Sequence, residues 1–492
     1  GDLLERLKSY SSTSETVKAI SHLKIDVEQL ILNTNQKVLK QEKRERKIFF
    51  DTIEQSPLTN EQSEAVISYD NRVQVIASAG SGKTSVMVAR TAYAIDKGFV
   101  EPNKVLLLAY SKDAAVELEE RINERLSVAN IPSEGVKAST FHALGLKIIA
   151  HATGRKPRVA PWVKNHGNGI KEILRIVEQL RAADENFNLE WDMFRLVWGR
   201  PVDDKNPEGG IRDGYDRQNR RNGFKTTDGK IVKSHGERLI CNWLWFHGVR
   251  YFYEKPFHVD TATVEHSRYH PDFYYPEIDS WHEHFGIDEH GRVSPEMESN
   301  GYLEGMEWKR QQHRNHSPNP LIETTFYDVV VRGDFSNLQH ALESRGIVLN
   351  RDPQREPETN VALDDEDLAN LIRTFMRHIK SNQLTKSDVE TLSKDSRAHK
   401  FLKIFWPVLE AWNSNLRENN YVDYEDMLAN AVVALEQGDY DPGFDLILVD
   451  EFQDTSRSRI RFVKALLRKR NQFLLTVGDD WQSIYRFAGA DI

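Results

Sequence analysis

Cysteine is nearly absent from this sequence, because Cys241 is the only one among 492 residues. A disulfide framework is therefore excluded, and the composition fits a reducing compartment such as the cytoplasm. No apolar run reaches the roughly 18 residues that a membrane span needs, so we expect no membrane partner. An excess of positive charge is also lacking, since the formal net charge is −9. Nucleic-acid binding would therefore have to rely on a local groove and not on the total charge.

Hydrophobic residues make up 39% of the chain and charged residues 29%. This balance is typical of a globular protein with true apolar cores. A length of 492 residues indicates several domains, or one domain that carries large insertions.

A glycine-rich segment lies between a short β-rich run at 73–76 and an apolar-periodic helix. It consists of Ala77, Ser78, Ala79, Gly80, Ser81, Gly82, Lys83 and Thr84. The strand–loop–helix context predicts a phosphate-binding loop, in which the glycines let backbone N–H groups face an anion. Lys83 would reach the β- and γ-phosphates of a nucleotide, and the Thr84 hydroxyl would bind Mg²⁺.

Two later strands end in polar residues that suit the same site. The apolar run 444–449 is followed by Asp450 and Glu451, and the run 473–477 leads to Gln482. Asp450 would hold Mg²⁺, Glu451 would activate the attacking water, and Gln482 would sense the γ-phosphate. Strands that alternate with helices and converge on one crevice predict an α/β domain with a parallel sheet.

Gln62 has two interpretations. Thr59 with Gln62 three residues later is a capping-box pattern, which on spacing alone predicts a structural role at a helix start. A role in nucleotide binding comes only from the resemblance that follows.

Six short segments occur in a fixed order along the chain, at 58–62, 77–84, 109–112, 140–142, 450–455 and 482–486. Together they resemble the motifs of the UvrD/Rep-like superfamily 1 DNA helicases. The resemblance implies a RecA-like P-loop fold, the cofactors ATP and Mg²⁺, and movement in the 3′ to 5′ direction along single-stranded DNA or DNA with a single-stranded tail. It also implies that Gln62 reads adenine and that Gln482 couples the γ-phosphate to DNA.

The same resemblance implies a set of DNA-binding residues, namely Tyr110, Ser111, Lys112, Thr140, Phe141, His142, Tyr485 and Phe487. The aromatic members would stack on bases, an interaction worth ~1–3 kcal/mol per base. For each aromatic residue the alternative is packing in the core. The chain stops soon after these motifs, so we expect the second RecA-like domain of the family to be missing. That domain brings arginine fingers, so we expect this chain alone to hydrolyse ATP poorly and not to unwind DNA.

The 367 positions between Lys83 and Asp450 leave room for an insertion (450 − 83 = 367). Within it, Glu237 in a helical run, Asp272 near one strand and Glu283 in the next resemble the order of acids in the PD-(D/E)XK nuclease fold. Phe285 occupies the position of the usual lysine, and Lys309 from a helix at 302–313 could replace it. Lys309, Gln312, His313 and His316 share one face of that helix, which would either complete an active site or form a basic surface. The alternative is a nuclease fold kept only as a structural module.

These observations predict the following organisation. Residues 1–55 form an N-terminal helical region, 56–150 and 421–492 a RecA-like ATPase domain, 151–230 and 346–420 a helical subdomain, and 231–345 a nuclease-like α/β insertion.

Three further alternatives stay open. The charged stretch 37–47 is either a helix face packed on the next domain or a basic arm for nucleic acid or a protein partner. The chain could belong to an ATPase that remodels a protein complex such as RNA polymerase through that arm, or to a nuclease that a helicase core supplies with DNA. The histidines near 258–290 lack cysteines and regular ligand spacing, so zinc is disfavoured.

Overall fold

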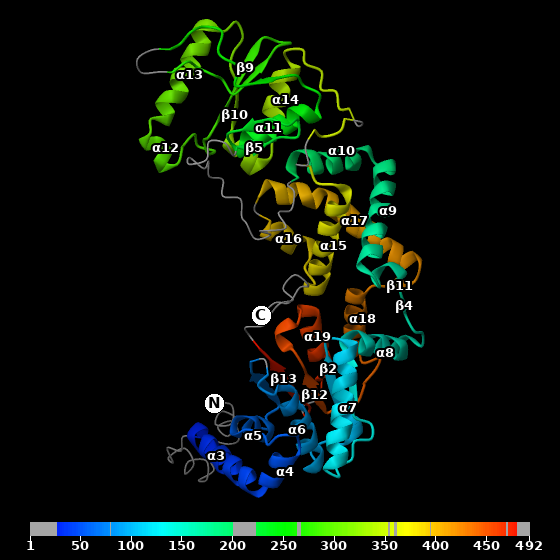
Figure 1. Ribbon diagram of the computed structural model, residues 1–492. Coiled ribbons are helices and arrows are strands. Elements are labelled where there is room, and N and C mark those ends of the chain that lie inside the picture. Colours follow the sequence, from blue (N-terminus) through cyan, green and yellow to red (C-terminus); the bar gives the residue numbers. More distant parts are fainter. Residues whose placement is uncertain are drawn as a thin grey trace, which may run out of the picture. The chain divides into compact units, whose positions relative to one another are not determined.

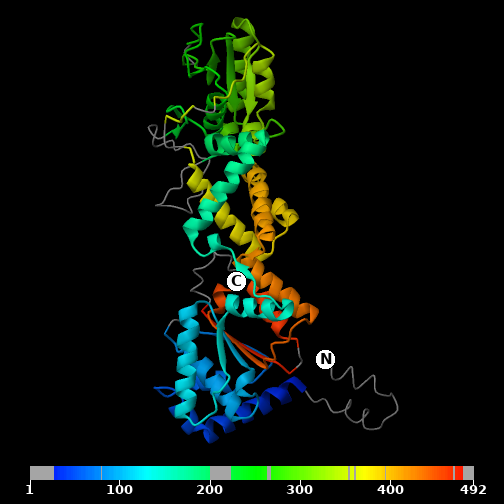
Figure 2. The same cartoon turned by 90° about the vertical axis from the view of Figure 1, so that its right-hand side faces the viewer.

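The computed structural model describes residues 27–78, 80–199, 223–262, 267–352, 355–358, 362–393, 395–468 and 471–479. They belong to two compact units: a first unit made of the chain up to Pro157 and again from Tyr424, and a second unit, Arg158–Asp423. Figures 1 and 2 show both from two sides. None of the described helices is long and apolar enough to span a membrane.

The described strands of the first unit form a parallel sheet in the order β1-β13-β12-β2-β3 (Figure 1). Their bounds are β1 Arg72–Ile76, β2 Val105–Ala109, β3 Lys137–Thr140, β12 Leu446–Val449 and β13 Phe473–Gly478. β2 and β12 are buried along their whole length, which explains their unbroken apolar sequences. The predicted α/β architecture with a parallel sheet is confirmed. All of these strands run in one direction, so their carboxyl ends meet at one edge.

Helices cover this sheet. Their bounds are α3 Val27–Glu45, α4 Lys47–Thr52, α5 Asn60–Ile67, α6 Lys83–Asp96, η1 Pro102–Lys104, α7 Lys112–Val128, α8 Phe141–Thr153, α18 Tyr424–Gln437, η5 Phe452–Asp454 and α19 Arg457–Leu466. α6 and α7 bury Met87 and Ile122 in one core with the strand residues Leu107 and Leu448. α18 packs against both α8 and α19.

The charged part of α3 contacts neighbouring helices of the first unit. Glu42 accepts hydrogen bonds from Lys97 at 2.7 Å and from the Tyr93 hydroxyl at 3.1 Å. Lys43 forms an ion pair with Glu64 at 2.9 Å. These contacts favour the interpretation of 37–47 as a helix face packed on its neighbour. Earlier in the same helix, Ile31 is 54% exposed.

The second unit begins and ends at adjacent points, because β4 (Arg158–Val159) and β11 (Tyr421–Val422) pair in parallel. Next to β11, the fully buried Asp423 forms an ion pair with Lys380 at 2.5 Å. The helical part between them has the bounds η2 Pro161–Val163, α9 His166–Ala183, α10 Glu185–Met193, η3 Phe194–Trp198, α15 Asp365–Asn382, α16 Lys386–Leu392 and α17 Ser396–Glu418.

The remainder of the second unit is an α/β arrangement (Figure 1). Its bounds are β5 Phe224–Lys225, β6 Ile231–Val232, α11 His235–Phe246, β7 Phe252–Tyr253, β8 Phe273–Tyr275, β9 Ser280–Phe285, α12 Pro295–Ser299, α13 Tyr302–His316, β10 Ile322–Thr325, η4 Tyr327–Arg332 and α14 Ser336–Glu343. β7, β8 and β9 are antiparallel neighbours, and β10 joins β9 in parallel.

Two helices pack on opposite faces of this four-stranded sheet. On one face, Lys309 and Arg310 of α13 pair with Glu283 and Glu323. On the other face, Gly236 of α11 comes so close to His284 that a Cβ there would clash with the imidazole. Successive side chains of a strand point to opposite faces, so Glu283 and His284 meet different helices.

A hydrogen-bond network links histidines on the α11 face, of which His282 is fully buried and His284 half-buried. His282 Nε2 and His284 Nδ1 lie 2.8 and 2.9 Å from the Thr324 hydroxyl, and the Tyr275 hydroxyl lies 2.8 Å from His282 Nδ1. Burial lowers the pKa of His284 to about 4 and that of His282 well below its usual value. Both imidazoles are therefore neutral in the folded protein at physiological pH.

We predict that acid destabilises the second unit through these imidazoles. Below pH 6.5 the unfolded chain binds protons at them, while folded His284 binds one only near pH 4. The stability that the neutral imidazoles give the folded state is therefore fully present above pH 6.5, and it is lost as the pH falls towards 4. His284→Gln should make the fall of the thermal unfolding midpoint between pH 7 and 4 shallower, as measured by circular dichroism.

His290→Gln, at an exposed position, is the matched control, and it should retain the steeper dependence because the buried imidazoles remain. Equal slopes for wild type and His284→Gln would contradict the prediction.

Candidate functional site

The glycine-rich loop has the geometry that its sequence requires. Gly80 and Gly82 have φ angles of +75° and +85°, and Gly82 is the N-cap of α6. A side chain at Gly82 would also clash with the amide of Gln62. The Ser81 N–H and hydroxyl both donate to the Ser78 carbonyl, at 3.2 and 2.6 Å. The left-handed backbone therefore requires glycine at 82, and any larger side chain would also displace the Gln62 amide.

Gln62 joins helix α5 to this loop. Its Oε1 accepts from the Thr59 N–H at 2.8 Å and its own N–H donates to the Thr59 hydroxyl at 3.2 Å, which completes the capping box. Its Nε2 donates to the Ser81 carbonyl at 2.8 Å. The capping role predicted from spacing is therefore present, and the same amide also contacts the loop.

A cavity of about 650 Å³ opens beside Gln62. Thr59, Ser85 and Arg121 contribute to its wall. The Arg121 guanidinium is held by the Ser85 hydroxyl at 2.9 Å and by the buried Glu54 at 3.1 Å. Sequence reasoning did not find Arg121, because on α7 it looks like any other charged residue of an exposed face.

The acids of β12 reach the loop. Lys83 Nζ lies 3.0 Å from Glu451 Oε2, with the Lys83 side chain only 10% exposed. Gln453 Nε2 donates to the same Oε2 at 2.7 Å, and Gln453 Oε1 accepts from the Asp479 N–H at 2.9 Å. Glu451 has a φ of +47°, a left-handed conformation that costs a non-glycine residue about 1 kcal/mol or more. Gln453, which sequence reasoning missed, thus connects the ends of β12 and β13.

Asp450 and Thr84 supply oxygen donors beside Lys83. Burial and repulsion from Glu451 raise the pKa of Asp450, while Lys83 lowers it. A divalent cation near Asp450 would offset the unfavourable charge, and carboxylate and hydroxyl oxygens are ligands that Mg²⁺ accepts. The two residues therefore fit the predicted Mg²⁺ site.

Two of the aromatic residues predicted to bind DNA lie at neighbouring strand ends. Tyr110 follows β2 and Phe141 follows β3, and the Arg459 guanidinium lies over both rings at 4.4 and 5.7 Å. Phe141 is only 3% exposed, which favours the core-packing alternative for that ring. Tyr110 is partly exposed.

Polar residues at the same edge also have local roles. The Ser111 hydroxyl caps α7 and the Thr140 hydroxyl caps α8, each accepting a backbone N–H at 3.1 Å. Lys112 is exposed. Burial and the neighbouring Arg459 lower the pKa of His142 to about 4, so its ring is neutral. The remaining predicted residues, Ala79, Gln482, Tyr485 and Phe487, lie outside the described residues, and their roles stay predictions.

The four nuclease-like residues come together in the second unit. Lys309 pairs with the fully buried Glu283 at 2.5 Å, and Asp272 Oδ2 accepts the His284 N–H at 2.7 Å. Burial and repulsion from Glu283 and Glu237 raise the pKa of Asp272, and Lys309 opposes this rise. By contrast, His313 is 2% exposed and bonds to the Tyr269 hydroxyl at 3.1 Å, so it adds nothing to a basic surface.

Comparisons with known proteins agree with the geometry. The model of the UvrD/REP helicase N-terminal domain matches residues 58–195 and 274–492. DNA helicase IV of Escherichia coli (strain K12) is 26% identical over 493 residues, which cover 99% of this chain and 49% of that protein.

Shorter stretches match other helicases. The ATP-dependent DNA helicase Rep of Buchnera aphidicola is 31% identical over 137 residues, 27% of this chain and 20% of that protein. The ATP-dependent DNA helicase PcrA of Staphylococcus aureus is 35% identical over 98 residues, 20% of this chain and 13% of that protein. The chain thus spans at most about half the length of these relatives. Since the matched model covers well over half of the chain, the protein belongs to the UvrD/REP helicase family through its N-terminal domain.

Proposed function

We propose that this chain carries the nucleotide-binding domain of an ATP-dependent 3′ to 5′ DNA helicase of the cytoplasm. The main support is the convergence of the ends of β1, β12 and β13, which brings Lys83, Glu451, Gln453 and the Asp479 backbone into one chain of contacts. Family membership supports the same assignment. In this proposal residues 56–150 and 421–492 form the RecA-like ATPase domain.

The Lys83–Glu451 ion pair supports a sequence of events on nucleotide binding. Phosphate oxygens compete with Glu451 for the Lys83 ammonium, because charge-assisted hydrogen bonds to either partner are strong. When Lys83 turns to the phosphates, Glu451 is left to orient the attacking water and take its proton. Gln453 holds the carboxylate in place during this exchange. Thr84 and Asp450 would hold Mg²⁺, which neutralises charge on the transferring phosphoryl group.

DNA would cross the edge where β2 and β3 end. Tyr110 offers a partly exposed ring there, and Lys112 offers an exposed charge for the phosphate backbone. The substrate would be single-stranded DNA or a duplex with a single-stranded tail, in line with the names of the related DNA helicases.

A protein partner on α3 is the alternative proposal. Leu32 and Val38 are, like Ile31, at least half exposed on this helix, so an apolar surface is available. ATP hydrolysis measured with single-stranded DNA and with candidate protein complexes separates the two proposals. Stimulation by DNA supports the helicase, and stimulation by a protein complex alone supports the remodelling ATPase.

Lys83→Ala should weaken nucleotide binding by about 10- to 100-fold, because hydrogen bonds to charged groups are worth about 1.5–3 kcal/mol. The measurement is titration with a fluorescent ATP analogue in the presence of Mg²⁺. Lys104→Ala, at the opposite end of β2, is the matched control and should bind as the wild type does. Equal affinities of Lys83→Ala and wild type would remove the main support for the nucleotide site.

Glu451→Gln should have the opposite effect on affinity. It removes the ion pair that competes with phosphate for Lys83, so nucleotide should bind about 3- to 10-fold more tightly. Hydrolysis should fall, because the carboxylate that accepts the proton is gone. The same titration and a phosphate-release assay measure both quantities. Glu436→Gln, at an exposed ion pair on α18, should change neither.

A further inference from the structure

Asp272 and Glu283 are cross-strand neighbours in the second unit. Phe273 of β8 pairs with His282 of β9, so the residues one step further along, Asp272 and Glu283, stand opposite each other. The bond from the His284 N–H to Asp272 Oδ2 at 2.7 Å confirms that these strand ends are close. Each oxygen of Glu283 has a partner, the Tyr269 hydroxyl at 2.6 Å and Lys309 at 2.5 Å. Two carboxylates and a lysine thus occupy one end of the sheet.

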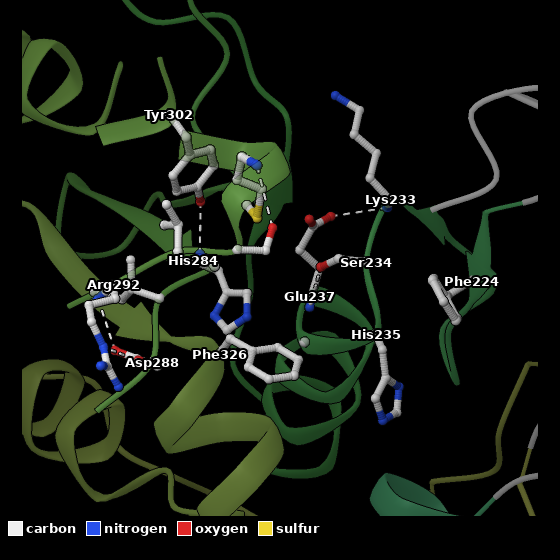
Figure 3. Close-up of a pocket in the computed structure, with 16 residues that line it drawn as sticks. Phe224, Lys233, Ser234, His235, Glu237, His284, Asp288, Arg292, Tyr302 and Phe326 are labelled. Atoms are coloured by element: carbon white, nitrogen blue, oxygen red, sulfur yellow. Dashed lines mark hydrogen bonds and ion pairs between the residues drawn. The ribbon is translucent and has the colours of Figure 1, made fainter. Parts of the chain in front are cut away.

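Glu237 brings a third carboxylate from α11. Its Oε2 accepts the Lys233 N–H at 3.0 Å and the Tyr253 hydroxyl at 2.5 Å. The other oxygen, Oε1, accepts no hydrogen bond from the described part of the chain, although the residue is 92% buried. Figure 3 shows Glu237 at the wall of a cavity, near His284 and Tyr302. Glu237 Oε1 thus offers the cavity a carboxylate oxygen with no partner in the described part of the chain, which favours a ligand there.

The cavity has the size of a ligand site. Its volume is about 650 Å³, within the roughly 300–1,000 Å³ typical of small-molecule pockets. Lys233 and Arg292 line it, each paired with an acid, Glu254 and Asp288. Tyr302, which also lines it, accepts the Gly286 N–H at 2.8 Å. A phosphate group with its sugar fits this volume, and its oxygens would compete with the two acids for Lys233 and Arg292.

Charge at this end of the sheet is unbalanced. Asp272 and Glu283 share the single cation Lys309, and Glu237 adds a further negative charge near Asp272, while the Lys233 ammonium is already paired with Glu254. Burying such groups is costly, and apolar residues of similar volume would stabilise a merely structural fold at least as well. In the described part of the chain no group of three or more histidine, cysteine, aspartate or glutamate side chains is arranged to hold a metal ion. A cation here would have one or two carboxylate ligands and water for the rest, as Mg²⁺ commonly does.

We propose that this cluster is a second active site, which hydrolyses phosphodiester bonds of DNA with a divalent cation. Asp272 and Glu283 hold the cation, and Lys309 contacts the attacking water. The water oxygen forms a bond to phosphorus while one P–O ester bond breaks. Glu237 Oε1 takes the proton from that water, and the leaving oxygen takes a proton from solvent. The products are one end with a phosphate monoester and one with a free hydroxyl.

This activity goes beyond the proposed helicase function and needs no nucleotide. The family model matches 58–195 and 274–492, so Glu237 and Asp272 fall in the segment that it leaves out. The domain that defines the family therefore does not account for these two carboxylates.

The test uses the whole chain, without ATP, on end-labelled single-stranded DNA, tailed duplex, supercoiled plasmid and an RNA strand of the same sequence. Cleavage of DNA should require Mg²⁺ or Mn²⁺ and stop with a chelator. Asp272→Asn and Lys309→Met should each slow cleavage by about 100-fold or more. Glu277→Gln, an exposed acid in the turn between β8 and β9, is the matched control and should cleave as the wild type does.

Circular dichroism shows whether a variant has lost cleavage because it no longer folds. A second measurement then tests metal binding separately from cleavage. Calorimetric titration with Mn²⁺ alone should show binding to wild type and to Glu237→Gln, with cleavage lost in the latter. Absence of cleavage by wild type with either cation would overturn the proposal. The proposal would also be overturned if Asp272→Asn and Lys309→Met cleaved at the wild-type rate, because the cleavage would then come from a co-purified nuclease. Cleavage of RNA but not DNA would overturn the assignment of the substrate.

Discussion

The ion pair between Lys83 and Glu451 is the contact on which the proposed chemistry of the first unit depends. Its two residues are 368 positions apart in the chain and 3.0 Å apart in space. The sheet order makes this possible, because β13 lies between β1 and β12 and all three run in parallel. The strand ends can meet only if the long excursion between them closes on itself. The pairing of β4 with β11 meets this requirement, since the second unit starts and ends at adjacent strands.

Both clusters of the protein join carboxylates at strand ends to a lysine from a helix. In the first unit the lysine begins α6, where the helix dipole adds to its charge. In the second unit Lys309 lies within α13 and reaches across the sheet face to Glu283. The Lys83 side chain is 10% exposed and the Lys309 side chain 33% exposed. The acid that each lysine contacts balances its positive charge. A phosphate oxygen that displaces one partner of such a pair gains a strong contact with little rearrangement of the backbone.

The sequence predicted local features well and burial less well. The glycines of the loop, the strands that end just before Asp450 and Tyr110, and the helix that Ser234 caps follow from local patterns, and the structure contains them. The partial burial of Lys309 and the interior position of Phe141 depend on which elements pack together, and motif spacing does not contain that information. Arg121 and Gln453 were missed for the same reason, since each acts through partners that are distant in sequence.

Gln453 links the proposed phosphate site to a second strand of the sheet. Its amide nitrogen holds Glu451 and its amide oxygen holds the backbone of Asp479, at the end of β13. Gly478 lies so close to the same side chain that a Cβ there would meet Gln453 Oε1. A planar amide fixes the distance between its two ends, so Glu451 cannot shift without moving either Gln453 or the Asp479 backbone. In the proposed exchange of Lys83 from Glu451 to a phosphate, the released carboxylate would therefore act through Gln453 on the end of β13, the strand that leads to the predicted γ-phosphate sensor.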